Sequence, residues 1–136
     1  MRARKSVTAT AAGLALAVGA APAAAATWTL EDLEQRICVD PEYGHAGAYF
    51  LGSVSGSWSR TITTGLSDLP PGSVFKGSSV LPPSSHENPP GAKMVNVFAG
   101  VAIGPAPAGE YVARLWATDG SSTQSQPVRI VFDEAC

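Results

Sequence analysis

The fold of this chain is decided by residues 50–63, FLGSVSGSWSRTIT. Every odd position from Ser53 to Thr63 is a serine or threonine, whereas apolar side chains occupy even positions, at Phe50, Val54, Trp58 and Ile62. An alternation of period two is typical of a β-strand with one wet face and one buried face. The Ser55-Gly56 pair predicts a hairpin turn inside the stretch.

The same period recurs downstream in three further segments. Their inward positions are Val95, Val97, Val101 and Ile103, then Tyr111, Ala113, Leu115 and Ala117, and then Val128, Ile130 and Phe132. Segments rich in Gly, Pro, Asp and Ser separate them at 105–109 and 119–122, which predicts turns there.

Only residues 29–36 suggest a helix. Thr29 and Asp32 have the spacing of a capping box, but the same residues also fit a strand. We expect at most one short helical turn, followed by a strand through Cys38. With 14 Gly, 11 Pro and six or seven short strands, the chain predicts an all-β fold, a two-sheet antiparallel immunoglobulin-like sandwich of about seven strands.

Residues 107–120, PAGEYVARLWATDG, resemble the late strands of bacterial immunoglobulin-like and fibronectin-like extracellular modules. The resemblance implies that Tyr111 is a tyrosine corner, whose hydroxyl bonds to nearby backbone. The whole chain also resembles small uncharacterised secreted proteins of actinobacteria, a family with no assigned activity. This similarity supports the sandwich and leaves the function open.

The first 26 residues have the features of a secretory signal peptide. Arg2, Arg4 and Lys5 precede an apolar run from residue 7 to 21, and Ala24 to Ala26 form a small-residue cleavage site. We therefore predict a signal peptide at 1–26, a single domain at 27–136, and a secreted protein. No later stretch has the 18 or so consecutive apolar residues of a membrane span.

The net charge disfavours some classes of binding partner, and the cysteine content bears on the redox compartment. Three of the nine Lys and Arg residues lie in the predicted signal, which leaves six against 11 Asp and Glu. This acidic balance argues against nucleic acid or an anionic membrane as a partner. Cys38 and Cys136 are the only cysteines, and two lone cysteines in an oxidising compartment usually form a disulfide.

Motifs of known chemistry are absent from the sequence. His45 and His86 are the only histidines, and neither comes with the neighbours that a zinc site or a catalytic base requires. We therefore predict no catalytic residues, no metal and no cofactor.

Two features exceed what a plain sandwich requires. Residues 76–93, KGSSVLPPSSHENPPGAK, form a long segment with two Pro-Pro pairs, either a loop presented to a partner or a solvated insertion. The alternation also turns Phe98 outward, and Trp116 outward beside Arg114, with Trp28 and Tyr49 as further members of an aromatic set. Exposed aromatic rings stack on sugars or anchor protein partners. The alternative is that Trp116 is covered and belongs to a second small core.

The sequence thus predicts a secreted, non-catalytic module that binds an extracellular protein or a cell-wall polysaccharide surface. One alternative is an extracellular protease inhibitor that uses the 76–93 loop. Another is a carbohydrate-binding module that uses Trp116, and a third is a hydrolase whose residues are dispersed along the chain.

Overall fold

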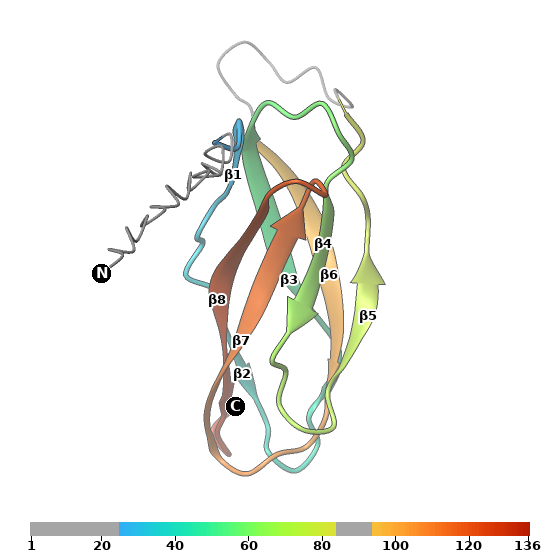
Figure 1. Cartoon of the computed structure of the whole chain (residues 1–136). Helices are drawn as coiled ribbons and strands as arrows, with labels where there is room; N and C mark the ends of the chain where they lie inside the picture. The colour runs from blue at the N-terminus through green and yellow to red at the C-terminus, as the bar shows by residue number, and fades with distance from the viewer. Residues whose placement is uncertain (1–24, 84–93) are drawn as a thin grey trace, which may run out of the picture.

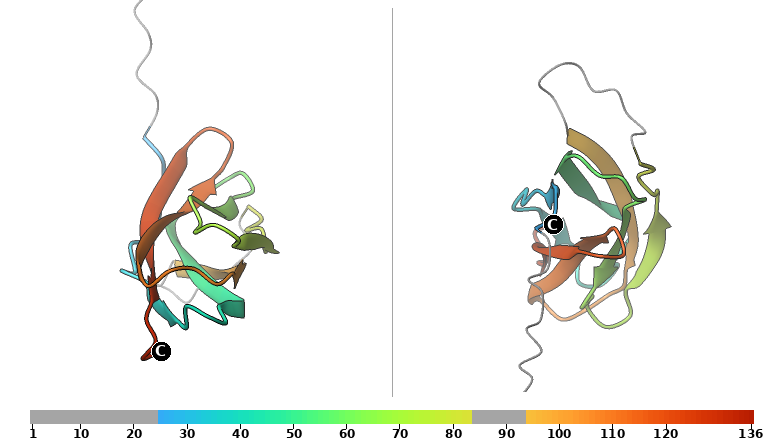
Figure 2. Two further views of the ribbon diagram at one scale, coloured as in Figure 1. Left: turned by 90° about the horizontal axis from the view of Figure 1, so that it is seen from below. Right: turned by 45° about the horizontal axis from the view of Figure 1, so that its top comes forward.

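A computed structural model of the chain describes residues 25–83 and 94–136. Nearly all of the predicted signal peptide and the second part of the 76–93 segment, residues 84–93, therefore lie outside the described residues. Two four-stranded sheets face each other across the core (Figure 1), and the described residues contain no helix. The left view of Figure 2 shows the sandwich from below, and the right view shows it tilted by 45°. The predicted all-β sandwich is confirmed.

Each sheet combines strands from both halves of the chain. The first has the order β1-β3-β6-β5, with β1 Trp28–Leu30, β3 His45–Gly56, β6 Met94–Ile103 and β5 Val74–Ser78. The second has the order β2-β8-β7-β4, with β2 Arg36–Val39, β8 Thr123–Phe132, β7 Gly109–Thr118 and β4 Thr63–Ser67. All neighbours are antiparallel except β2 and β8, which are parallel.

The strand order is that of a constant-type immunoglobulin sandwich with one strand added. The first sheet corresponds to strands A-B-E-D of that fold, and β4-β7-β8 correspond to C-F-G. The added strand is β2, because the N-terminal strand divides into β1 in one sheet and β2 in the other. This division raises the number of strands from the predicted seven or so to eight. It also introduces one parallel pair, which corrects the fully antiparallel arrangement predicted from the sequence.

The division occurs at residues 31–35, where we expected a helical turn. Asp32 instead accepts the Glu34 N–H at 2.9 Å through its carboxylate, and Glu34 has a left-handed φ of 49°. Asp side chains commonly bend the backbone in this way. The predicted capping box is therefore wrong, whereas the predicted strand through Cys38 is confirmed as β2.

The core follows the predicted alternation on β6, β7 and β8. The buried positions on these strands are Val95, Val97, Ala99, Val101, Ile103, Ala113, Leu115, Ala117, Val128, Ile130 and Phe132. A second cluster lies around Trp28 and includes Leu30, Val54, Ile62 and Leu81. Trp28 is only 2% exposed, which corrects its expected place among the outward aromatics.

Residues 50–63 form the end of β3 and a crossing to the second sheet. β3 ends at Gly56, whose φ of 98° and close approach to Thr27 exclude a side chain, and residues 57–62 then pass to the second sheet. The predicted hairpin at Ser55-Gly56 is therefore wrong. Trp58 lies in this crossing, where it is half-buried and donates its indole N–H to the Pro82 carbonyl at 3.2 Å.

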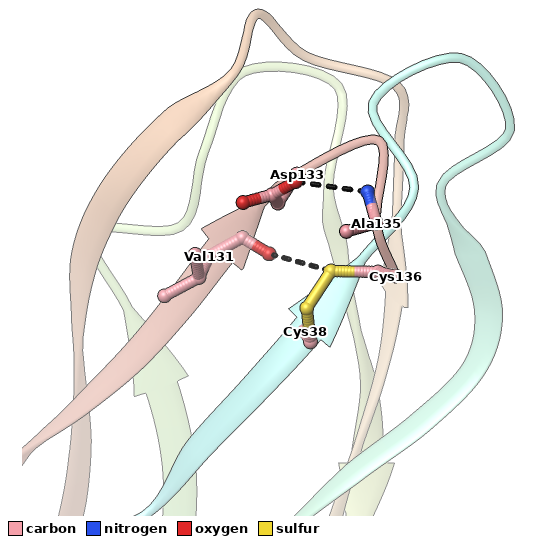
Figure 3. The surroundings of a disulfide bond; sticks show 5 residues. All are labelled: Cys38, Val131, Asp133, Ala135 and Cys136. Atoms are coloured by element: carbon pink, nitrogen blue, oxygen red, sulfur yellow. Dashed lines mark hydrogen bonds between the residues drawn. A yellow bond between two sulfur atoms is a disulfide. The ribbon is translucent and has the colours of Figure 1, made fainter.

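Two predicted features fix the ends of the strands. The Tyr111 hydroxyl donates to the Pro107 carbonyl at 3.4 Å, and its ring packs edge-on against Phe132 at a centroid distance of 5.3 Å. A disulfide joins Cys38 on β2 to Cys136 (Figure 3). The Asp133 N–H also donates to the Val39 carbonyl at 3.1 Å, so the C-terminal residues are held against β2.

Candidate binding surface

Phe98 and Trp116 lie on opposite outer faces of the sandwich. Phe98 belongs to β6 in the first sheet, and Trp116 belongs to β7 in the second. Both point away from the core, because their strand neighbours Val97 and Leu115 are buried. The structure therefore does not bring the predicted aromatic set together. Alternation gives the face of a strand, but not the sheet to which the strand belongs.

Trp116 is half-buried on its outer face. Its cross-strand partner on β4 is Gly65, and a Cβ at that glycine would overlap the six-membered part of the indole ring. The ring therefore occupies the space that a side chain at position 65 would fill. Arg114 beside it is exposed and forms an ion pair with Asp68, with 3.5 Å between Nε and Oδ2. Trp116 is thus a partly covered surface residue that belongs to neither core cluster.

Phe98 instead pairs with Tyr49, which the sequence suggested as a further member of the aromatic set without assigning it to a strand face. The two side chains are 59% and 55% exposed, with ring centroids 5.0 Å apart and an interplanar angle of 73°. Tyr49 on β3 lies opposite Gly100, and Phe98 lies opposite Leu51. Because Gly100 has no side chain, the diagonal contact between the two rings is open.

We define the aromatic face as Tyr49, Leu51, Met94 and Phe98, on the outer side of β3 and β6. Met94 is 52% exposed and Leu51 is half-buried. The other outward positions from Gly47 to Ser55 and from Met94 to Ala102 carry only Gly, Ser, Asn and Ala. The two central strands therefore place aromatic and aliphatic side chains, and no charged side chain, outward over these residues, while Ser55 at the rim donates to the Glu31 carboxylate. Exposed apolar patches commonly mark interaction sites.

A groove adjoins the aromatic face between β2 and the first half of β3. It has a volume of about 360 Å³ and is lined by Gln35, Arg36, Ile37, His45, Gly47, Ala48, Tyr49 and Phe50. We call it the edge groove. Tyr49 belongs to both the groove and the aromatic face, so the two features form one continuous surface.

The edge groove lies along an incompletely paired stretch of β3. On the side of β3 away from β6, the Ser53 carbonyl accepts the Glu31 N–H at 2.8 Å. The Gln35 carboxamide then caps Leu51, accepting its N–H at 2.6 Å and donating to its carbonyl at 2.8 Å. Because main-chain groups alternate between the two edges, those of Tyr49 also face this side. Within the described residues, no strand pairs with β3 there.

The edge groove carries positive charge without a balancing acid. Arg36 is exposed, and in the described part of the chain it has no ion-pair partner. Its neighbour in the parallel register is Arg129, which pairs with Glu110 at 2.5 Å. None of the groove-lining residues is acidic.

Among residues 25–83 and 94–136, one titratable group has a strongly shifted pKa, and it lies far from the groove in the sequence, in the turn between β7 and β8. Hydrogen bonds from the Ser122 N–H, the Trp28 indole N–H and the Ser121 N–H lower the pKa of Asp119 to about 2. Each of these bonds favours the ionised carboxylate. Asp119 thus ties the predicted 119–122 turn, which is confirmed, to the buried Trp28 of β1.

No catalytic constellation is visible in residues 25–83 and 94–136. These residues contain no group of three His, Cys, Asp or Glu side chains that could hold a metal ion. His45 accepts the Gly47 N–H at 3.3 Å through Nδ1, and the other histidine, His86, lies outside the described residues. Nor do the described residues form a helix long and apolar enough to cross a membrane.

A comparison with models of known protein families assigns the chain to a family. Residues 29–134 match DUF5980, which is described as a family of unknown function. This protein is a member of DUF5980. No curated protein matches the chain.

The DUF5980 match runs from β1 to just beyond β8, so it spans the whole sandwich. It includes the aromatic face, the edge groove and Cys38. The family description assigns no activity, and the surface chemistry therefore carries the functional argument.

Proposed function

We propose that this DUF5980 protein is a secreted, non-catalytic module that binds a protein partner through the aromatic face. The exposed Tyr49–Phe98 pair, on two strands that turn no charged side chain outward between residues 47 and 55 and between 94 and 102, is the observation that carries the proposal. Protein interfaces are enriched in Tyr, Phe and Met, and their centres are poor in charged residues. The aromatic face has this composition.

Secretion by an actinobacterium is part of the proposal. The predicted signal peptide and the resemblance of the whole chain to secreted actinobacterial proteins support it. The Cys38–Cys136 disulfide is compatible with it, since disulfides persist mainly in oxidising compartments.

A protein partner is favoured over a polysaccharide by the geometry of the rings. At an interplanar angle of 73°, Tyr49 and Phe98 do not form the flat platform on which successive sugar rings stack. Trp116, the residue expected to bind carbohydrate, is half-buried against Gly65.

The structure gives less support to the protease-inhibitor alternative, which requires a loop that projects from the sandwich. Lys76 belongs to β5, and Leu81 exchanges two backbone hydrogen bonds of 2.9 Å with Ile62. The first part of the 76–93 segment is therefore tied to the sandwich, and residues 84–93 lie outside the described residues.

Site-specific photo-crosslinking tests the proposed interface. A benzoylphenylalanine at position 98 should form covalent adducts with a protein from the medium or cell wall of the producing organism. The same probe at Val112, which is 52% exposed on the opposite sheet, is the matched control and should form none with that protein.

Competition makes the test specific. Excess unmodified protein should abolish the adduct, whereas excess Phe98→Thr should not. Because Phe98 is largely exposed and its main contact is the cross-strand pair with Tyr49, this substitution should cost no more than about 1 kcal/mol of stability. Equal adducts from positions 98 and 112, or retention on purified polysaccharide with no protein adduct, would contradict the proposal.

A further inference from the structure

We infer that the edge groove receives an extended, acidic segment of the partner, which adds to β3 as a further strand at Tyr49. This inference rests on the proposed function, and it names the chemistry of the partner. It follows from the unpaired edge of β3, the unbalanced charge of Arg36 and the continuity of the groove with the aromatic face.

The edge of β3 already has a row of hydrogen-bonding partners that stops one step before Tyr49. β1 pairs with β3 at residues 54–56, the Glu31 N–H bonds to Ser53, and the Gln35 side chain replaces a strand at Leu51. The main chain of Tyr49 is the next position in this row. An extended segment in the groove would continue the row, and strand addition of this kind derives affinity from main-chain hydrogen bonds.

The positive charge of Arg36 favours an acidic segment as the occupant of the edge groove. Arg36 and Arg129 are neighbours on β2 and β8, but only Arg129 has a carboxylate partner among the described residues. A carboxylate in the groove would pair with Arg36 and offset the repulsion between the two guanidinium groups. This local charge is opposite in sign to the net charge of the chain, which is −2.

Charge also disfavours the chain's own N-terminal segment as the occupant. Residues 1–24 contain Arg2, Arg4 and Lys5 and no acidic residue, so their charge has the same sign as Arg36. A second copy of the chain is a separate outcome that the experiment detects.

Two labelled peptides test the charge preference by fluorescence polarisation. Acetyl-Thr-Val-Glu-Val-Thr-Val-amide should bind the purified secreted protein about tenfold more tightly than the same peptide with Lys in place of Glu. Arg36→Glu should reverse this preference. Arg114→Glu, at an exposed arginine on the outer face of the second sheet, is the matched control and should leave it unchanged.

N-methylated peptides test strand addition itself. Successive amides of a strand point to opposite edges, so methylation of one alternate set should abolish binding, whereas methylation of the other set should not. Hydrogen exchange of the Tyr49 amide should slow when the unmethylated peptide binds. Equal binding of both methylated peptides, or equal binding of the Glu and Lys peptides, would overturn the inference.

The outcomes separate this inference from the proposed function. If position 98 crosslinks a protein but neither peptide binds, the inference fails and the aromatic face stands. If the Glu peptide binds with the expected selectivity but position 98 gives no adduct, the proposed face fails. A dimer in sedimentation equilibrium that Arg36→Glu dissociates would identify a second copy as the occupant and would overturn the inference.

Discussion

At the scale of single residues, Gly65 and Trp116 show why an outward aromatic is not always a free one. The sequence correctly turns Trp116 away from the core, but the cover comes from a strand about 50 positions earlier in the chain. Gly65 leaves the space into which the indole ring fits. No local pattern reveals that a glycine on one strand lies opposite a tryptophan on another.

A double-mutant cycle tests this contact. Gly65→Ala should displace the Trp116 ring and cost about 1 kcal/mol, within the range for overpacking. In a Trp116→Ala background the same change should cost little, because no ring remains to be displaced. Urea unfolding measures the stabilities, and acrylamide quenching of tryptophan fluorescence should increase in Gly65→Ala. Equal costs of Gly65→Ala in both backgrounds would contradict the contact.

Asp119 gives a pH-dependent prediction at the same scale. Its pKa is lowered from 3.8 to about 2 by the folded structure, so between these values the unfolded chain binds more protons. Stability therefore rises with pH in this window, and Asp119 contributes less as the pH falls from 3.8 to about 2. Above the window its contribution is fully present.

Asp119→Asn isolates this contribution. The new amide cannot both accept the Ser121 and Ser122 N–H groups and accept the Trp28 indole N–H, so the variant should melt at a lower temperature than wild type. Calorimetric melting temperatures should converge as the pH is lowered toward 2. A difference that stays constant over this range would show that the carboxylate charge is not stabilising.

At the scale of elements, the sequence predicted the faces of the long strands well and the short ones poorly. β6, β7 and β8 have ten residues each, so period two is repeated often enough to set their inward positions. β1 and β2 have three and four residues. Such short strands show no periodicity, and β2 pairs with residues of β8 that lie more than 90 positions away in the chain.

Glutamine side chains on β8 hold β1 in place. Gln124 accepts the Leu30 N–H at 2.9 Å and donates to the Trp28 carbonyl at 2.8 Å, and Gln126 donates to the Leu30 carbonyl at 2.9 Å. Each carboxamide thus supplies hydrogen bonds that a neighbouring strand would otherwise provide. This arrangement has no signature in the sequence, where both residues appear as ordinary polar positions.

Gln124→Ala tests this side-chain pairing. Leu30 is fully buried and would lose the partner of its N–H, so the variant should be destabilised by about 1–3 kcal/mol. Ser125→Ala, at the adjacent exposed position of β8, should change stability by no more than about 0.5 kcal/mol. Urea unfolding measures both changes. Equal effects of the two substitutions would show that β1 does not depend on the glutamine.

At the scale of the whole molecule, the two outer faces of the sandwich differ in chemistry. The face of β3 and β6 is uncharged and aromatic, whereas the face of β7 and β8 carries the Arg114–Asp68 and Arg129–Glu110 pairs. The sequence predicted that Phe98 is exposed, but it merged the two faces into one aromatic set. The edge groove was missed altogether, because it exists only where the divided N-terminal strand leaves β3 unpaired.

The disulfide couples the stability of the sandwich to the edge groove. Cys38 and Cys136 are 98 positions apart, and closure of so long a loop contributes about 4–5 kcal/mol in the chain-entropy model. β2 carries Cys38 and also Arg36 and Ile37 of the groove, and its strand pairing is limited to four positions against β8. Loss of the bridge should therefore loosen one wall of the groove while the aromatic face remains on β3 and β6.

Cys136→Ser tests this coupling. The variant should unfold at a lower urea concentration, with a loss of a few kcal/mol, and reduction of the wild type with dithiothreitol should reproduce the change. In the absence of urea the variant should remain folded. Its binding of the Glu peptide should then be weaker than that of the wild type, whereas crosslinking from position 98 should persist. If both signals persist undiminished, β2 is held by its strand pairing alone, whereas loss of both would show that the bridge supports the first sheet as well.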